Sequence, residues 1–441
     1  MTRYFPRKFI GIILGLLLVV LAISPPISDL LLLPQTARLV VGEQMAVKLT
    51  WPAMILDKLN FSVGGSFSPS ESAIVVDRGE DGYQLRALKP GQADVTVKLL
   101  GYIPLKSIQV ESLPTHEVMV GGHSIGIMLQ SEGIMVVGYA PIKGLMGREV
   151  YPARTQGIKT GDLIMKVNDN PVYTETAMAE AIDKCGQSGT QPRLLVKRNG
   201  SEENISVSPV YCPETGRFRI GLSVRDGVAG VGTLTCWDPK THSFAALGHA
   251  IVDSDTKKTV SIREGRIVGA SIQAIEPGYP GQPGEKIGVF DQSATMKGEI
   301  ESNTIFGVFG RTEVKCKNVL YPSLIPVGYA HQVKKGPAQI VTVIEGDRLE
   351  KFEVVIEKVY SFRQSGKGMV IRVTDPRLLS ISGGIVQGMS GSPIIQDNRL
   401  VGAVTHVFLN DPQRGYGIIM DNMLEQMNFL TSQGYSRQIA Q

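Results

Sequence analysis

Short runs of alternating apolar and polar residues dominate the chain and are separated by turn residues. The segment 30–112 shows the pattern clearly, for example at 37–41 and 46–50, each run ending close to a glycine or a polar cluster. Alternation with turns at intervals of roughly 8 to 12 residues is typical of antiparallel strands packed in two layers. We therefore expect a mainly β protein whose residues 30–112 form a small β-sandwich.

A different pattern follows in the segment 113–210. Glycines at turns precede an alternating strand, Leu163 to Val167, and residues 176–185 have helical spacing with Gly186 just past their end as a stop. This order of turn, strand and helix resembles a PDZ domain over nearly the whole of 113–210. The resemblance implies a fold that binds an extended peptide at the edge of a sheet.

The upstream run Ser124, Ile125, Gly126 and Ile127 would be the loop and edge strand that receive this peptide. An edge strand has unpaired N–H and C=O groups, so a peptide can add to the sheet as a further strand. A PDZ ligand is therefore an expected partner. The alternative is a PDZ fold that serves only as an intramolecular clamp on the rest of the protein.

Residues 211–432 return to short strands with glycine-rich turns, and none of these turns has the spacing of a phosphate-binding loop. The segment is long enough for a trypsin-like double β-barrel serine protease domain. It holds two distinctive motifs, Ala-Leu-Gly-His around His249 and Gly-Met-Ser-Gly-Ser-Pro around Ser390. We expect these motifs to carry the chemistry.

A serine hydroxyl becomes a useful nucleophile only beside a base and beside amides that stabilise an oxyanion. The spacing favours Ser390 as nucleophile, His249 as its base, and the N–H groups of Gly388 and Ser390 as the oxyanion hole. Histidine before serine is the chymotrypsin order and argues against an α/β-hydrolase esterase. Met389 stands where trypsins carry an acidic residue, so the trypsin zymogen switch is not expected.

The third catalytic residue is left open by the spacing. Asp253 and Asp255 lie close to His249 in sequence, whereas Asp375 precedes a proline at the end of an apolar strand. An Asp before Pro is often only a turn former. His406 is the main rival to His249 as the base, although its position after Ser390 makes it the weaker candidate.

The motifs together closely resemble the stage IV sporulation protein B peptidase family of endospore-forming bacteria, over most of the chain after about residue 110. The resemblance rests on Gly-Val-Gly-Thr-Leu-Thr, Ala-Leu-Gly-His-Ala-Ile-Val-Asp, Val-Thr-Asp-Pro and Gly-Met-Ser-Gly-Ser-Pro. It implies His249, Asp375 and Ser390 as the catalytic triad. It further implies a sporulation signalling enzyme that cleaves itself and a membrane-bound regulator, which releases an intramembrane protease and activates a late mother-cell sigma factor.

The first residues predict export. Arg3, Arg7 and Lys8 precede an uncharged apolar run, 9–23, that ends at a Ser-Pro-Pro breaker. This is the pattern of a signal peptide or an uncleaved signal anchor, and we assign it to residues 1–28. With the resemblance, it implies location in the forespore intermembrane space, with membrane association before cleavage.

Composition and residue spacing argue against several kinds of partner and cofactor. A formal charge of +4 on 441 residues, without a basic cluster interleaved with aromatics, disfavours nucleic acid as a partner. The four cysteines form no CxxC pair and the histidines have no metal-ligand spacing, so we expect no metal and no cofactor. We expect free thiols, and the alternative in an oxidising compartment is one or two disulfides. The alternative function is a non-catalytic adaptor, built of PDZ and β-domains, that regulates a membrane complex by binding.

Overall fold

The computed structural model describes residues 33–49, 51–64, 72–79, 82–143, 148–291, 296–312, 318–360 and 366–428. The chain separates into two compact units, which meet in sequence between His116 and Glu117. The predicted signal segment 1–28 lies outside the described residues. Within the described ranges, no helix is long and apolar enough to cross a membrane.

The first unit is the expected small β-sandwich. Its two sheets share one apolar core that includes Leu39, Leu85 and Ile108, each fully buried. The strand order of the first sheet is β1 (Thr36–Val40), β7 (Ile103–Leu113), β6 (Gly91–Leu99) and β3 (Leu59–Gly64). The order of the second is β2 (Gln44–Lys48), β5 (Gly82–Ala87) and β4 (Ile74–Gly79), and a short helix α3 (Ala53–Leu56) completes the unit.

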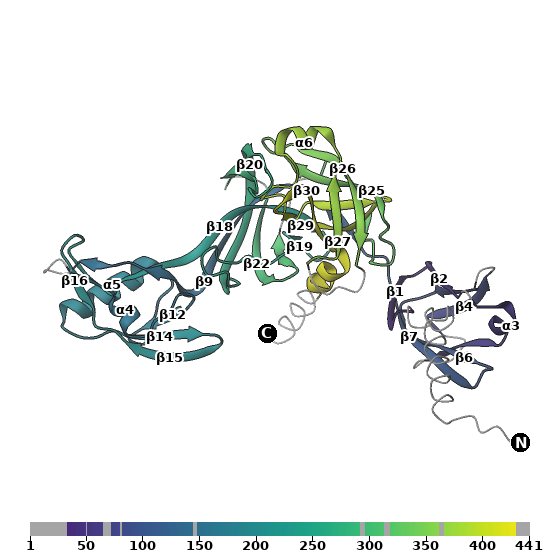
Figure 1. The fold of residues 1–441 in the computed structure, drawn as a ribbon, viewed down its shortest axis with the longest axis horizontal. Coiled ribbons are helices and arrows are strands. Elements are labelled where there is room, and N and C mark those ends of the chain that lie inside the picture. Colours follow the sequence, from purple (N-terminus) through teal and green to yellow (C-terminus); the bar gives the residue numbers. More distant parts are fainter. Residues whose placement is uncertain are drawn as a thin grey trace, which may run out of the picture. The chain divides into compact units, whose positions relative to one another are not determined.

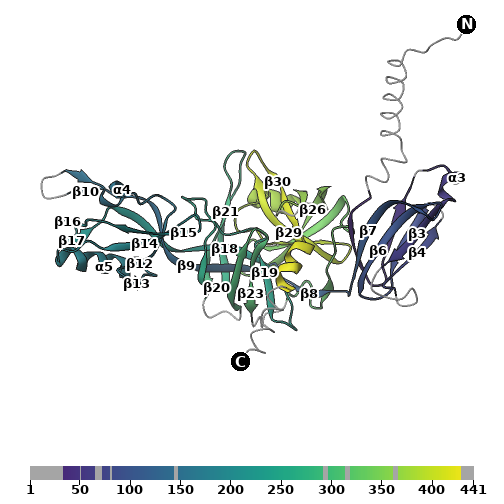
Figure 2. The same ribbon diagram turned by 90° about the horizontal axis from the view of Figure 1, so that it is seen from below.

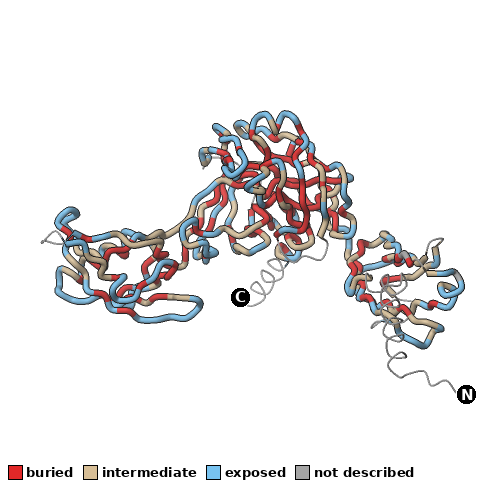
Figure 3. Tube along the Cα trace, viewed as in Figure 1, coloured by how far each residue is buried: buried red, intermediate tan, exposed pale blue. Residues whose placement is uncertain are grey.

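The second unit contains a closed six-stranded barrel (Figure 1). Its strands are, in order around the barrel, β25 (Gly336–Val343), β26 (Leu349–Val359), β27 (Met369–Val373), β30 (Asp411–Ile419), β29 (Arg399–Phe408) and β28 (Pro393–Gln396). Figure 3 shows that buried residues gather in this barrel, because closure leaves no strand edge and turns one side of every strand inward. Helix α6 (Pro376–Ser382) lies between β27 and β28 in sequence.

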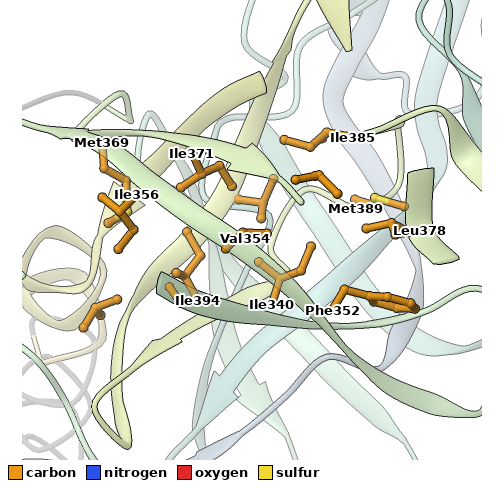
Figure 4. Close-up of a cluster of buried hydrophobic side chains, with 14 of the residues drawn as sticks. Ile340, Phe352, Val354, Ile356, Met369, Ile371, Leu378, Ile385, Met389 and Ile394 are labelled. Carbon is orange, nitrogen blue, oxygen red and sulfur yellow. The ribbon is translucent and has the colours of Figure 1, made fainter. Parts of the chain in front are cut away.

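The apolar filling of the barrel reaches the loop that holds the predicted nucleophile. Met389 is fully buried and belongs to the same cluster as Phe352 and Leu378 (Figure 4). A carboxylate at this position would enter an apolar core at a large desolvation cost. The replacement of the trypsin acidic residue by methionine thus has a packing reason.

A large antiparallel sheet forms the rest of the second unit. Two of its strands have 16 residues each, β9 (Ser124–Tyr139) and β18 (Leu222–Trp237), and they pair along most of their length. Figures 1 and 2 show that this pair runs from the barrel side of the unit into the smaller lobe with helix α5 (Glu175–Gln187). Within this sheet, six strands pair in a closed ring: β9, β20 (Ile262–Glu276), β22 (Lys297–Thr304), β23 (Gly307–Thr312), β19 (Ser243–Ala246) and β18, which pairs again with β9. The described residues therefore hold a second barrel, and the expected trypsin-like double barrel is confirmed.

The remaining strands of this sheet are β8 (Glu117–Val120), β12 (Leu163–Val167), β13 (Asn170–Pro171), β14 (Arg193–Arg198), β15 (Ser201–Ser206), β21 (Glu285–Asp291) and β24 (Ile325–Pro326). Two short hairpins and a helical turn lie in the smaller lobe: β10 (Ile142–Lys143) with β11 (Glu149–Val150), β16 (Val210–Cys212) with β17 (Arg217–Arg219), and α4 (Pro152–Thr155).

The smaller lobe, which contains helix α5, is inserted in the chain between the first half of β9 and the second half of β18. Residues 117–130 pair with β18, β20 and β24. The smaller lobe is formed by the chain between residue 130 and the second half of β18. The predicted boundaries at 113 and 211 stay predictions, and the pairing adds that residues 117–130 join strands that come after residue 211. Periodicity alone cannot show this, because one uninterrupted strand serves both lobes.

Helix α5 extends slightly beyond the predicted 176–185. Thr174 caps it by accepting a hydrogen bond from the Ala177 N–H, at 3.2 Å. The helix continues through Gly186, so the predicted stop at that glycine is wrong. A side chain on Gly186 would collide with the ring of Phe218 on β17, and close packing explains the glycine.

Three of the four cysteines, Cys185, Cys212 and Cys236, are free and buried. The expectation of free thiols is confirmed for these three, and Cys316 lies outside the described residues.

Candidate active site

The loop around Ser390 has the backbone shape that its glycines allow. Gly388 and Gly391 adopt φ values of +90° and +93°, a region that side chains other than glycine rarely enter. A Cβ on Gly391 would collide with the Thr233 carbonyl oxygen on β18 and lie 2.5 Å from the Leu247 amide nitrogen. The absence of a side chain thus lets the loop pack directly against the segment that leads to His249.

Hydrogen bonds from two strands fix the loop. The Thr233 N–H donates to the Ser390 carbonyl at 3.0 Å, and the Thr233 hydroxyl donates to the Gly388 carbonyl at 2.7 Å. From the other side, the Gly391 N–H donates to the Val404 carbonyl at 2.8 Å. Strands β18 and β29 therefore hold Ser390 between them.

The N–H groups of Gly388 and Ser390 have no hydrogen-bond acceptor within the part of the chain that the structure describes. Buried or half-buried amides without an acceptor are uncommon in folded proteins and need an explanation. Two such amides, two residues apart around a serine, are the arrangement that a developing oxyanion requires.

The Ser390 hydroxyl itself donates to the Thr405 carbonyl, at 2.7 Å. His406 follows Thr405 on β29, and its ring centroid lies 5.0 Å from that of His249. The serine loop and the His249 turn thus meet at Thr405 and His406. The structure brings Ser390 and His249 to one place without a direct hydrogen bond between them.

His249 has a defined tautomer. Its Nδ1 lies 2.8 Å from the Ala250 carbonyl oxygen, which can only accept, so Nδ1 carries the hydrogen. Nε2 of the neutral ring is then free of hydrogen and can accept a proton. Burial lowers the pKa of His249 below its usual 6.5, although the Ala250 carbonyl opposes the change.

His406 is a poorer base than His249. Burial, with smaller contributions from the neighbouring His249 and Lys367, lowers the pKa of His406 to about 4. A group of such low basicity takes a proton from a serine hydroxyl less readily than one nearer neutrality. The preference for His249 over His406 has a physical reason here.

Asp375 does not contact His249. It is the N-cap of α6, where its carboxylate accepts hydrogen bonds from the Arg377 N–H at 3.0 Å and the Glu353 N–H at 3.3 Å. Burial raises its pKa, but the bonds from Arg377 and Glu353 outweigh this and hold the pKa below its ordinary value. The expected triad contact is absent from this structure, because the carboxylate is held by the helix N-terminus, the Glu353 N–H and the Arg377 guanidinium, which lies 3.0 Å away.

The other candidate carboxylates are also engaged elsewhere. Asp253 accepts hydrogen bonds from the Asp255 and Thr256 N–H groups, at 3.1 and 2.8 Å, and pairs with Arg225. Asp255 pairs with the same arginine at 2.8 Å. None of the ion pairs among the described residues involves His249, so both aspartates serve the turn after it.

Comparison with protein-family models decides the family. The model of the SpoIVB peptidase S55 matches residues 216–424, and that of a PDZ domain matches residues 141–208. Residues 216–424 belong to the SpoIVB peptidase S55 family. The first match contains both motifs of the candidate site, and the second contains helix α5, so the resemblance and the PDZ prediction are confirmed.

Solved structures of proteases also match, at low similarity. The Rv3671c protease of M. tuberculosis in its inactive form is 11% identical, with 45% of this chain and 83% of that chain covered and a TM-score of 0.27. Its active form is 12% identical, with 46% and 74% covered and a TM-score of 0.27. The HtrA-type protease AlgW with a decapeptide is 10% identical, with 47% and 53% covered and a TM-score of 0.26. No residue role is carried over from them.

The predicted peptide-binding edge of the PDZ domain is wrong. Ser124 to Ile127 lie in the first half of β9, which pairs with β18 on one side and whose Ile125 to Ile127 pair with β20 on the other, and all four residues are buried. A strand with both sides occupied cannot accept a peptide. An edge paired on one side only is found at Leu222–Arg225, the first part of β18, which pairs with β9.

Sequence reasoning missed Lys286, which lies directly beneath the serine loop of this S55 domain. Its side chain is only 4% exposed, and the Cβ position of Gly388 lies 3.0 Å from the Lys286 Cβ. The ammonium donates to the Thr342 hydroxyl at 2.7 Å, and the Ser392 hydroxyl donates to the same oxygen at 3.1 Å. Burial lowers the pKa of Lys286 to about 7.

Nothing in the sequence distinguishes this lysine. It stands in an alternating strand, where a lysine ordinarily points to solvent. No ion pair among the described residues includes it, and within the same ranges no group of three or more His, Cys, Asp or Glu side chains is placed to hold a metal ion.

Proposed function

We propose that this protein is a serine endopeptidase in which Ser390 attacks the substrate carbonyl and His249 is the general base. The observation that carries the proposal is the loop 388–391, in which Ser390 has two amides without acceptors beside it, its own and that of Gly388, inside a peptidase family domain. The coarser statement, a serine protease, follows from the family itself. The residue roles are supported by the geometry.

The reaction needs one rotation of the serine side chain. In the structure the hydroxyl donates to the Thr405 carbonyl, and turning about the Cα–Cβ bond would redirect the hydrogen toward Nε2 of His249. Nε2 takes the proton as Oγ bonds to the carbonyl carbon, and the Gly388 and Ser390 amides receive the oxyanion. His249 then gives the proton to the leaving amine, and water hydrolyses the acyl ester by the same steps.

We propose that the Ala250 carbonyl takes over part of the role usually given to a carboxylate. A hydrogen bond to Nδ1–H selects the useful tautomer and fixes the ring, at 2.8 Å in this structure. A neutral carbonyl stabilises the imidazolium less than a carboxylate does.

The biological role that we propose is the one implied by the family name, sporulation signalling. The enzyme would be exported, cleave itself, and cut a membrane-bound regulator so that an intramembrane protease is released and a late mother-cell sigma factor becomes active. Location in the forespore intermembrane space accords with the basic and apolar pattern of residues 1–28.

The PDZ domain supports a peptide ligand in this proposal. We place the ligand at the edge of Leu222–Arg225, close to α5, where the Glu175 N–H donates to Asp226 at 3.2 Å. An extended peptide could add there as a further strand.

One observation favours a second function, the non-catalytic adaptor. The Ser390 hydroxyl is bonded to a main-chain carbonyl, and no carboxylate among the described residues pairs with His249. A domain that only binds would tolerate this arrangement, whereas the peptidase must leave it during each cycle.

The experiment compares purified residues 30–441 as wild type, Ser390→Ala and Ser392→Ala, with fragment termini read by mass spectrometry. Ser392 lies in the same loop but is fully buried, which makes it a matched control. The peptidase predicts fragments from the wild type and from Ser392→Ala but none from Ser390→Ala. Identical fragmentation, or none, in all three folded proteins would support the adaptor.

A further inference from the structure

Strand β21 begins beside the serine loop. The Lys286 N–H donates to the Gln387 carbonyl at 2.9 Å, and the Gln387 N–H donates to the Gly284 carbonyl at 2.8 Å. The chain at Gln387 thus runs parallel to the start of β21 and covers the first position of one of its edges. The other edge of β21 pairs along its whole length with β20.

The N–H and C=O groups of Gly288 and Phe290 point to the same edge as those of Lys286, because direction alternates along a strand. An independent contact supports this direction. Ile272, opposite Gly288 on β20, exchanges both its hydrogen bonds with Gly346, at 2.7 and 2.8 Å, and none with Gly288. In the part of the chain that the structure describes, no strand pairs with this edge beyond Gln387.

The open part of the edge lies close to the nucleophile. The separation of Gly288 and Ser390 can be judged along strand β18. The Thr233 N–H on this strand bonds to the Ser390 carbonyl, and the Cβ position of Gly288 lies 3.5 Å from a methyl group of Val231 on the same strand. Two residues along a strand span roughly 7 Å. Gly288 therefore lies beside Val231, two residues along β18 from Thr233, which bonds to Ser390.

The two central outward side chains of β21 are apolar, and the charged residues Glu285 and Asp291 stand at the ends of the same face. Ile287 is 41% exposed and Val289 is 61% exposed, while Phe290 packs on Gly126 on the inner side. An exposed edge with apolar side chains is a ready template for another strand, and proteins usually protect such edges. A bound segment with apolar residues at alternate positions would cover both side chains.

We propose that the edge of β21 at Gly288 and Phe290 binds an extended apolar segment of the protein substrate, which adds as a strand and leads its scissile bond to Ser390. The proposal rests on the peptidase function proposed above. Continuity with the serine loop identifies the occupant, since Gln387 already pairs at the adjacent position of the same edge.

The test uses the full chain in detergent, with β-casein as an unfolded protein substrate. Ile287→Lys and Val289→Lys place a charge where the apolar segment would lie, at positions exposed enough for the fold to accept it. Val319→Lys is the matched control, because Val319 is 77% exposed in the same unit. We expect an about tenfold loss of kcat/KM, mainly through KM, in the two β21 variants only.

Backbone pairing has its own signature. In a decapeptide made from the best-cleaved casein site, N-methylation removes one N–H at a time. If the segment pairs with β21, methylation weakens cleavage at every second position on one side of the scissile bond. A loss without this alternation would overturn the strand model.

Labelling of Ser390 with a small fluorophosphonate separates this proposal from the peptidase itself. No labelling of the native protein refutes the peptidase. If labelling is normal and kcat/KM is equal in all variants, the β21 site is overturned. Normal labelling without casein cleavage by the native protein overturns it as well. A change in oligomeric state in the β21 variants, measured by light scattering, would assign the edge to a second copy of the chain instead.

Discussion

Replacement of Lys286 by methionine should stabilise the protein and remove a pH dependence of its stability. The lysine is buried beneath Gly388 with one hydrogen bond, to Thr342, and its pKa lies at about 7. Compared with the ordinary 10.5, this corresponds to roughly 5 kcal/mol at about 1.36 kcal/mol per pKa unit. Methionine fills a similar volume without a charge to bury.

The sign follows from proton binding. Between about pH 7 and 10.5 the unfolded lysine holds a proton that the folded lysine has released, so the free energy of unfolding rises with pH across this window. Below pH 7 both states are protonated and the cost of burial is fully present. The gain from Lys286→Met should therefore be largest at and below pH 7 and shrink toward pH 10. The lost bond to Thr342 offsets about 1 kcal/mol of it.

The assay is urea unfolding between pH 6 and 9.5, followed by fluorescence of Trp237 in a Trp51→Phe background. Trp237 is buried in the second unit, whereas Trp51 belongs to the first. Lys297→Met, at an exposed lysine on β22, is the control and should change little. A difference between wild type and Lys286→Met that is constant with pH, or a loss of stability at pH 7, would refute the reasoning.

Three further predictions concern the site. Gly391→Ala should lower the free energy of unfolding by more than about 3 kcal/mol, because its Cβ would collide with the backbone of Thr233. Gly157→Ala, with a φ of +90° and open space around it, should lower it by about 1 kcal/mol, and thermal unfolding measures both. Asp375→Ala should lose about 1 kcal/mol of helix capping at pH 7, and this loss should shrink in acid as the carboxyl of the wild type becomes protonated, with Ser390 labelling retained; a folded but unlabelled variant would restore the triad. The acid limb of the kcat/KM profile should fall below pH 6.5, because burial lowers the pKa of His249; a limb above 6.5 contradicts this assignment.

Structural features that depend on residues close together in the sequence were predictable. Glycines on both sides of the Met-Ser pair favour a backbone with positive φ, and Gly388 and Gly391 both have it in the structure. The alternation of apolar residues predicted strands, and the helical spacing of 176–185 marked helix α5 within one to two residues at either end.

Features that depend on strand neighbours were not predictable. The run from Ser124 to Ile127 has the composition of an edge strand, but its partners β18 and β20 come from chain about 100 and 140 residues away. Asp375 satisfies a helix N-terminus that follows it directly, and the short Asp-Pro motif fits that role as well as a catalytic one. Lys286 became notable only once Thr342 and Gly388 enclosed it.

The central claim is that His249 activates Ser390, and covalent labelling tests it most directly. Diisopropyl fluorophosphate forms an Oγ–P bond with an activated serine as the P–F bond breaks and the base takes the proton. We predict, by peptide mass spectrometry, an adduct on Ser390 in the wild type and in His406→Phe, and none in His249→Ala. Equal labelling of Ser390 in His249→Ala, or an adduct on another serine, would contradict the account.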